Sequence, residues 1–306
     1  MLSQPNAAWF TWVMTHPRHT PYDGSSKLFE IGLKPLELAD WIDVDERLQE
    51  YLDEKDRLIA AARDEVFAAQ AGTEDAQREV LELLVAHLPA RFPEIYRREG
   101  DAMLVAGRRV DLTETPALLA ASRLVEDDLV LMRRGETGWR LAAGCVCFPS
   151  SWQVKEKFGK PVDQIHGPVP GFGPGSRPAE LIARMFDNLM PDRIVIRWNW
   201  SLYGDGALAH PHVPLSPRYG IGEVADPVFL RSERQTMRRL PQSGDILFAI
   251  KVSVDPLESL ERHPNGATIA QSLIAQLGAL SDEQIAYKGM TGERERLVRR
   301  LNKVTN

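Results

Sequence analysis

The sequence predicts an α+β fold built on an antiparallel sheet. Short apolar runs occur either in hairpins or separated by helical segments of varied length, an order that does not fit regular βαβ repeats. With 43% hydrophobic and 26% charged residues, the composition is that of an ordinary globular protein. No stretch is rich enough in Gly, Ser or Pro to separate independent domains. We therefore expect one domain over residues 1–306, with an N-terminal elaboration (1–100) and a C-terminal one (257–306).

The first forty residues form an irregular, aromatic-rich segment. Prolines exclude regular structure there, but the aromatic surface is large enough to pack across the body of the fold. We expect an ordered cover, with a disordered tail as the alternative. The aromatic and proline residues are Trp9, Phe10, Trp12, Pro17, Pro21, Tyr22, Phe29 and Trp41.

A helical hairpin should follow. The spacing of Leu48, Leu52, Ile59 and Val66 among charged residues predicts an amphipathic helix over 45–70. After Gly72, a second helix is predicted from about residue 74 to 87, ended by a proline at position 89.

The middle of the chain predicts strands. Apolar runs cover 103–105, 129–133 and 139–148, and a glycine-bearing loop at 134–138 joins the last two in a hairpin. Two more strands fit 193–203 and 245–254, with helices near 178–188, 268–277 and from 281 to 286 or beyond. The basic stretch at 294–300 is most simply a solvated helix face, and the alternative is a docking surface for an acidic partner.

One histidine lies at a corner that looks rigid. The strand at 141–148 stops at Pro149, Ser150 or Ser151 can cap a short helix to residue 158, and Gly159 can end it. A second helical turn begins at Pro161 and ends at His166, and the following GPVPG segment must be extended. A fixed imidazole suits a metal or haem ligand. The alternative is a histidine that caps the helix or hydrogen-bonds inside the core.

Other candidate ligands are less distinctive. His210 and His212 share one side of a proline-rich segment and rival His166, although most such pairs are exposed loop residues. Cys145 and Cys147 lie two apart on a predicted strand, where a disulfide would need a rare distortion. We expect them to be buried core thiols, with haem ligation as the minor alternative.

The strand at 193–203 carries polar residues on one face. Alternation places Arg197, Asn199 and Ser201 together, opposite the apolar residues of the RWNW block. This polar face either lines a pocket or is the wet face of an edge strand.

Three blocks carry a resemblance to a known family: AAGCVCFPSSWQVKEKFGKPVDQIHGPVPGF at 142–172, RWNW at 197–200 and LRSERQTMRRLPQSGDILFAIKVSVDPL at 230–257. The chain resembles the haem-dependent oxidative N-demethylases over most of its length. The resemblance implies a PAS-like fold that binds haem b and uses dioxygen with electrons from a reductase partner. It further implies removal of a methyl group from a small secondary amine as formaldehyde, with His166 as the axial (metal) ligand.

The same resemblance gives roles to the polar residues. Arg197 becomes a haem propionate partner, and Asn199 can orient the substrate or an oxygen ligand. The segment 231–241 has helical spacing that aligns Arg231, Arg234 and Arg238 as a second cationic stripe, or as a solvated face. Glu233 in this segment is the candidate acid for a dialkylammonium substrate, the alternative being an exposed ion pair.

Composition and missing motifs exclude several functions. A net charge of −6 argues against a general nucleic-acid binder. The N-terminus does not read as a leader, and no apolar stretch reaches the roughly 18 residues of a membrane span, so we expect a cytoplasmic protein. Motifs for flavin, nicotinamide or iron–sulfur cofactors are absent, which implies a separate flavin or iron–sulfur reductase. The alternatives are a haem-PAS sensor of a gas or amine, and a scaffold subunit that has lost haem.

Overall fold

A long antiparallel sheet organises the molecule. The computed structural model describes residues 16–212 and 218–305. Its seven-stranded sheet has the order β1-β8-β9-β10-β6-β7-β2, and every neighbouring pair is antiparallel. The strands are β1 (Lys34–Leu36), β2 (Phe67–Ala69), β6 (Asp128–Gly135), β7 (Gly138–Cys145), β8 (Ile194–Tyr203), β9 (Phe229–Arg239) and β10 (Ile246–Pro256). The predicted α+β class with an antiparallel sheet is confirmed.

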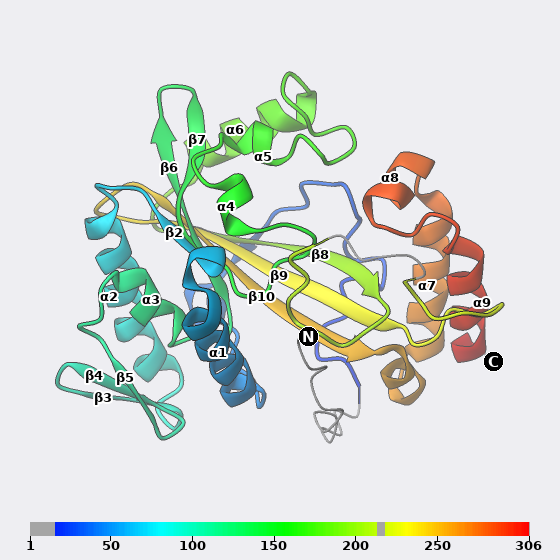
Figure 1. Ribbon diagram of the computed structural model, residues 1–306, viewed down its shortest axis with the longest axis horizontal. Helices are drawn as coiled ribbons and strands as arrows, with labels where there is room; N and C mark the ends of the chain where they lie inside the picture. The colour runs from blue at the N-terminus through cyan, green and yellow to red at the C-terminus, as the bar shows by residue number, and fades with distance from the viewer. Residues whose placement is uncertain (1–15, 213–217, 306) are drawn as a thin grey trace.

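Helices flank this sheet, and a second small sheet lies at one end (Figure 1). The small sheet has the order β3-β4-β5, with β3 (Tyr96–Glu99), β4 (Ala102–Val105) and β5 (Arg108–Asp111). The helices are η1 (Leu38–Asp40), α1 (Leu48–Val66), α2 (Glu74–Arg91), α3 (Ala117–Ser122), α4 (Val154–Lys157), α5 (Val162–Ile165), α6 (Arg177–Asn188), η2 (Leu257–Arg262), α7 (Gly266–Ala279), α8 (Asp282–Tyr287) and α9 (Arg294–Thr305).

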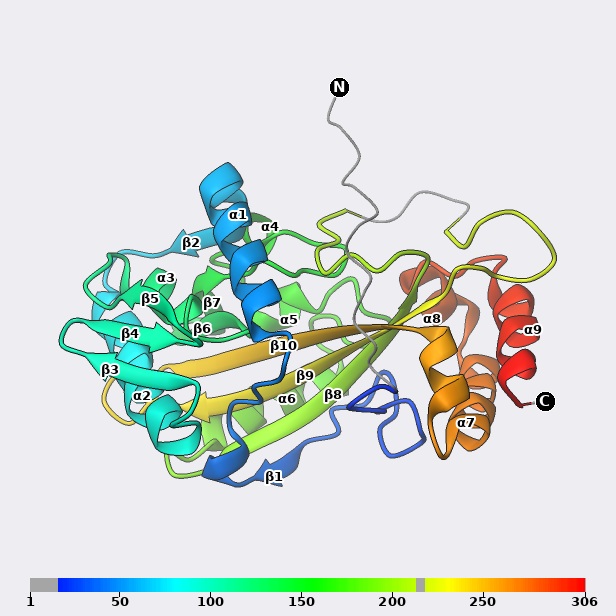
Figure 2. The same cartoon turned by 90° about the horizontal axis from the view of Figure 1, so that it is seen from below.

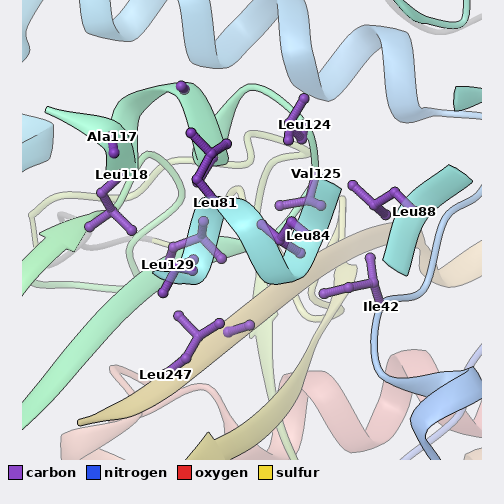
Figure 3. Close-up of a cluster of buried hydrophobic side chains, with 14 of the residues drawn as sticks. Ile42, Leu81, Leu84, Leu88, Ala117, Leu118, Leu124, Val125, Leu129 and Leu247 are labelled. Carbon is purple, nitrogen blue, oxygen red and sulfur yellow. The ribbon is translucent and has the colours of Figure 1, made fainter. Parts of the chain in front are cut away.

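Alternation along the strands divides the buried core between two faces of the sheet. We call the face covered by α2 and α3 the lower face. Figure 3 shows Leu81, Leu84 and Leu88 of α2 beside Leu129 of β6 and Leu247 of β10. The three α2 residues recur at helical spacing, so one stripe of the helix fills this half of the core.

The opposite, upper face is covered by α4, α5 and α6 (Figure 1). Val130 of β6, Met237 of β9 and Ile246 of β10 pack there against Ile182 and Phe186 of α6. The short helices α4 and α5 follow directly from β7, so the rigid corner predicted from sequence lies on this upper face.

The two terminal regions complete the body. Trp200 and Leu202, from the far end of β8 on its lower face, are buried with residues of α7 and α9, and Figure 2 shows these helices beside that end of the sheet. Tyr22 and Trp41 are buried, so the predicted aromatic cover is confirmed for the described part of the N-terminal segment. The expectation that prolines exclude regular structure there is wrong, because β1 pairs with β8 and η1 follows it. Trp9, Phe10 and Trp12 lie outside the described residues.

Several element predictions were wrong in detail. Residues 231–241 form most of strand β9 and not a helix. The second predicted helix runs on to Arg91 with Pro89 inside it, and the cap of α4 is Gln153 instead of a serine. The first predicted helix ends at Val66, because residues 67–69 form β2. The remaining predicted strands and helices are confirmed within a few residues of their bounds.

Candidate functional site

His166 stands at the end of α5, as the sequence predicts. Its Nδ1 lies 2.8 Å from the carbonyl oxygen of Val162 and can donate to it, which favours the tautomer with the lone pair on Nε2. Among the described residues, Nε2 has no hydrogen-bond partner. Burial, with smaller effects of nearby Lys157 and Arg197, lowers the pKa of His166 to about 4, so the imidazole is neutral at pH 7.

Arg197 lies on the upper face of β8 near this imidazole. Its guanidinium donates to the Gln235 side chain at 2.9 Å and to the carbonyls of Ile31 and Glu30 at 3.1 and 3.2 Å. No carboxylate among the described residues pairs with it, although Glu233 attracts it from a distance. Burial therefore lowers the pKa of Arg197, and two of its five N–H groups remain available for an anionic group.

Glu233 is a buried carboxylate whose two oxygens have different surroundings. Its Oε2 accepts from the side-chain amides of Asn199 (3.2 Å) and Gln235 (2.9 Å). Its Oε1 accepts no hydrogen bond from the described residues, and the nearest cation there, Nε of Arg231, lies 3.6 Å away. Burial alone would raise the pKa of Glu233, but Arg231, Lys288 and the two amides lower it overall. The group is thus an ionised carboxylate with one open oxygen.

Two lysines complete the cluster. Lys288, which follows α8, donates to Asn199 Oδ1 (3.2 Å), the Trp200 carbonyl (2.8 Å) and Ser201 Oγ (3.2 Å). Lys157, at the end of α4, lies over the Trp152 ring at 4.0 Å. Burial lowers the pKa of each lysine to about 8 against the attraction of Glu233.

The cluster has more positive than negative charge. Arg197, Lys157 and Lys288 form no ion pair with a carboxylate in the part of the chain that the structure describes. Uncompensated buried cations are costly unless an anion neutralises them. The arrangement therefore favours an anionic ligand beside the single carboxylate of Glu233.

The other candidate ligands have different surroundings. His210 is stacked on Tyr203 at 3.9 Å between centroids, and its Nε2 lies 2.9 Å from Asp205. His212 is exposed. Cys145 and Cys147 are free, buried thiols, as expected. Across residues 16–212 and 218–305, no three His, Cys, Asp or Glu side chains gather as a metal site.

The predicted arginine stripe of residues 231–238 does not exist, because alternation in β9 divides it between two faces. Arg231 shares the upper face with Glu233 and donates to the carbonyls of Phe148 and Leu208 at 2.6 Å. Arg234 donates to the carbonyls of Asp40 and Trp41, and Arg238 lies over the Trp41 ring at 4.5 Å. Both therefore lie on the lower face, away from His166.

Sequence reasoning missed three members of the cluster: Lys157, Gln235 and Lys288. Gln235 can be found from the sequence once β9 is recognised as a strand, because it lies two positions after Glu233 and so shares its face. Lys157 stands one residue before Phe158 in the block that carries His166. Lys288 has no local signal, since only the three-dimensional arrangement brings the end of α8 to β8.

Residues 32–298 match the family model described as "Haem-dependent oxidative N-demethylase, alpha subunit-like". The chain belongs to this family. It is accordingly a haem-dependent oxidoreductase, and the description as an alpha subunit implies further subunits. No helix within the described residues is long and apolar enough to cross a membrane.

The residues around His166 fit a haem. An imidazole anchored through Nδ1 leaves Nε2 for iron, and the spare cations suit two propionates. Partly buried apolar side chains of the upper-face core provide surface for a porphyrin to cover, among them Trp152, Phe158, Ile165, Phe172 and Val195. Donor type, charge and apolar surface thus agree with the requirement of the family.

Proposed function

We propose that this chain catalyses oxidative N-demethylation of a small methylated secondary amine, with dimethylamine as the representative substrate. The reaction takes dioxygen, two electrons and two protons, and yields the demethylated amine, formaldehyde and water. A separate flavin or iron–sulfur reductase subunit supplies the electrons. The observation that carries this proposal is the open carboxylate oxygen of Glu233 on the same face as the available Nε2 of His166.

Haem b is the proposed cofactor, and it supplies the oxygen chemistry when bound. His166 is the proposed residue that would hold the iron, and Arg197 would bind a propionate because its fork matches a carboxylate. Arg234 and Arg238 are not proposed as propionate partners, because their side chains lie on the lower face of the sheet. Lys157 and Lys288 contribute to the positive potential at the propionates.

Glu233 is the proposed acceptor of the substrate N–H. Its open Oε1 can receive a hydrogen bond, while Asn199 and Gln235 fix the orientation of the carboxylate through Oε2. A buried carboxylate offsets the cost of removing an amine from water. Asn199 has the further proposed role of orienting the substrate through its contact with Glu233.

We also infer a single, PAS-like domain spanning residues 1–306, with elaborations at 1–100 and 257–306. Two features support one folding unit. Strand β2, from the N-terminal region, pairs with β7 in the main sheet, and Lys288, from the C-terminal region, contacts β8. Neither terminal region is thus separate from the sheet that carries the proposed site.

The test is turnover by the haem-loaded protein. Supplied with a reductase and dioxygen, it should consume dimethylamine and release formaldehyde in equal amounts. If a panel of methylated amines neither shifts the ferric haem spectrum nor releases formaldehyde, the proposed substrate class is wrong. Reversible gas binding that changes the affinity for a partner would then favour the sensor alternative.

A further inference from the structure

Lys288 contacts the proposed amine site from outside the sheet. Strand β1 pairs with β8 only at Ile194, Val195 and Ile196, so the remainder of that edge of β8 is free of β1. Lys288, the residue that follows α8, lies against this free part of the β8 edge, and its ammonium donates to the Trp200 carbonyl at 2.8 Å. The C-terminal helices thereby reach the strand that carries Asn199.

The contact with Asn199 determines the orientation of its amide. An ammonium can only donate, so the atom 3.2 Å from Lys288 must be the oxygen Oδ1. The Nδ2 group then faces Glu233 and donates to Oε2 at 3.2 Å. A flipped amide would turn its oxygen toward the Glu233 carboxylate and its NH2 group toward the Lys288 ammonium, so the two charges together favour the observed orientation.

The charges around Lys288 come from two strands and one loop. Glu233 and Arg231 of β9, Arg197 of β8 and Arg218 of the preceding loop act on its ammonium. Glu233 is the one acid in this set, and Lys288 in turn favours its ionised form. Arg218 also donates to the backbone carbonyl of Lys288, which fixes the residue at both ends.

We propose that Lys288 is a positioning residue for amine binding, which sets the Asn199 amide and maintains Glu233 as a carboxylate with Oε1 open to the ligand. This inference rests on the proposed function in so far as Glu233 receives the amine. It adds a role for the C-terminal helices that the haem requirement alone does not imply.

Lys288→Met tests the inference without turnover. The side-chain amide signal of Asn199, assigned by its loss in Asn199→Ala, should shift in the NMR spectrum of the full-length variant. Dimethylamine, titrated against the ferric haem spectrum at pH 7, should bind about tenfold more weakly, because Asn199, which orients Glu233, loses its charged hydrogen-bonding partner. Lys303→Met removes an exposed charge on α9 and should behave as wild type.

The pH dependence of the Asn199 signal and of dimethylamine binding shows whether Lys288 acts through its charge or only by filling space. Burial lowers the pKa of Lys288 to about 8. The Asn199 signal of the wild type should therefore titrate near pH 8, and dimethylamine binding should weaken above that pH. Lys288→Arg keeps the charge, so binding at pH 7 should survive and the titration should disappear. Lys157 also has a pKa of about 8, and Lys157→Met should retain the titration if Lys288 is its source.

The outcomes distinguish this inference from the proposed function. If dimethylamine binds equally well to wild type and to Lys288→Met, and the Asn199 signal is unchanged, the positioning role of Lys288 is wrong. The proposal that Glu233 binds the amine is then unaffected. If wild type binds no dimethylamine but the Asn199 signal shifts and titrates as described, the substrate is wrong and the positioning role stands. Thermal melts of each variant show whether it is folded.

Discussion

The proposed ligand role of His166 rests on a difference between its two ring nitrogens. Nδ1 is bound to the Val162 carbonyl one turn earlier in the chain, while Nε2 has no described partner. The sequence predicts the rigid corner, because Pro161 starts the turn and GPVPG ends it. It does not predict which nitrogen is available, because that depends on the side-chain orientation.

At this position we expect His166→Ala to lose haem. The variant lacks the nitrogen that holds iron, so haem content and the Soret band should fall sharply after purification. His210→Ala is the matched control, since His210 already engages Asp205, and it should retain haem. An unchanged Soret band in His166→Ala would transfer the ligand role to another side chain.

Arg197→Ala should weaken haem binding without altering the shape of the spectrum. Loss of a charged hydrogen bond to a propionate costs about 1.5–3 kcal/mol, which faster haem transfer to apomyoglobin would reveal. Arg238→Ala is the control from the lower face of the sheet. Equal haem loss from both variants would contradict the assignment of Arg197 as the propionate partner.

Glu233→Gln should weaken amine binding while haem content stays constant. The substitution removes the negative charge and turns one of the two carboxylate oxygens into an amide donor, which leaves either the ligand or the Asn199–Gln235 pair without its acceptor. Titration of dimethylamine against the ferric spectrum measures the effect. Affinity equal to wild type would exclude Glu233 as the acceptor.

At the scale of elements, β9 shows where sequence patterns mislead. A strand with one polar face should alternate between polar and apolar residues, but β9 has charged residues on both faces. Arg231 and Glu233 lie on the upper face, and Arg234 and Arg238 lie on the lower face. Arg231 and Arg234 donate to buried backbone carbonyls, whereas Glu233 accepts from two side-chain amides. Arg238 lies over the Trp41 ring. A hydropathy pattern does not record such partners. The resulting charge spacing matches a helix by coincidence. Strand β8, polar on one face only, was predicted correctly.

The turn after β7 offers a test of stability at this scale. Asp128 of β6 accepts the backbone N–H groups of Cys147 and Phe148, one with each oxygen, at 2.8 and 2.9 Å. These bonds orient the chain that leads to α4. Asp128→Asn leaves one N–H without an acceptor, so unfolding in urea should show a loss of about 1–3 kcal/mol. Exposed Asp192→Asn should show no loss.

The same carboxyl should give a measurable pH dependence. Burial raises the pKa of Asp128 from 3.8 to about 6, so the folded state holds this proton more tightly than the unfolded state. Its contribution to stability is present below pH 3.8 and is lost as the pH rises through 6. The Asp128→Asn variant should lack this component, and parallel curves for the two proteins would contradict the assignment.

For the whole molecule, the sequence predicted the sheet-forming hairpin, most helices and the residues His166, Arg197, Asn199 and Glu233 as candidates. It did not predict that β1, β2 and the C-terminal helices converge on one sheet, because pairing over such distances leaves no local signal. The charge excess around Glu233 arises only from that convergence: Lys157 comes from α4 and Lys288 from the residue after α8. Assembly of the chain therefore creates the electrostatics of the proposed site.

A second buried cluster, on the lower face, joins distant segments and tests this assembly. Lys251 of β10 donates to Asp45 Oδ2 at 2.7 Å, to Glu126 Oε2 at 2.9 Å and to the Asp43 carbonyl at 2.9 Å. The ammonium is fully buried, and it connects the N-terminal segment and the approach to β6 to the sheet. Removing one partner of a buried ion pair leaves uncompensated charge.

Lys251→Met should therefore destabilise the fold by about 3–5 kcal/mol in urea unfolding, although methionine fills similar space. Lys251 lowers the pKa of Asp45 against the opposing effect of burial, so this stability is present above pH 3.8 and is lost as the pH falls. The variant should lose less stability on acidification than wild type. Because the cluster lies on the lower face, the folded fraction should keep its haem spectrum; a changed spectrum at native conditions would show that the two faces are coupled.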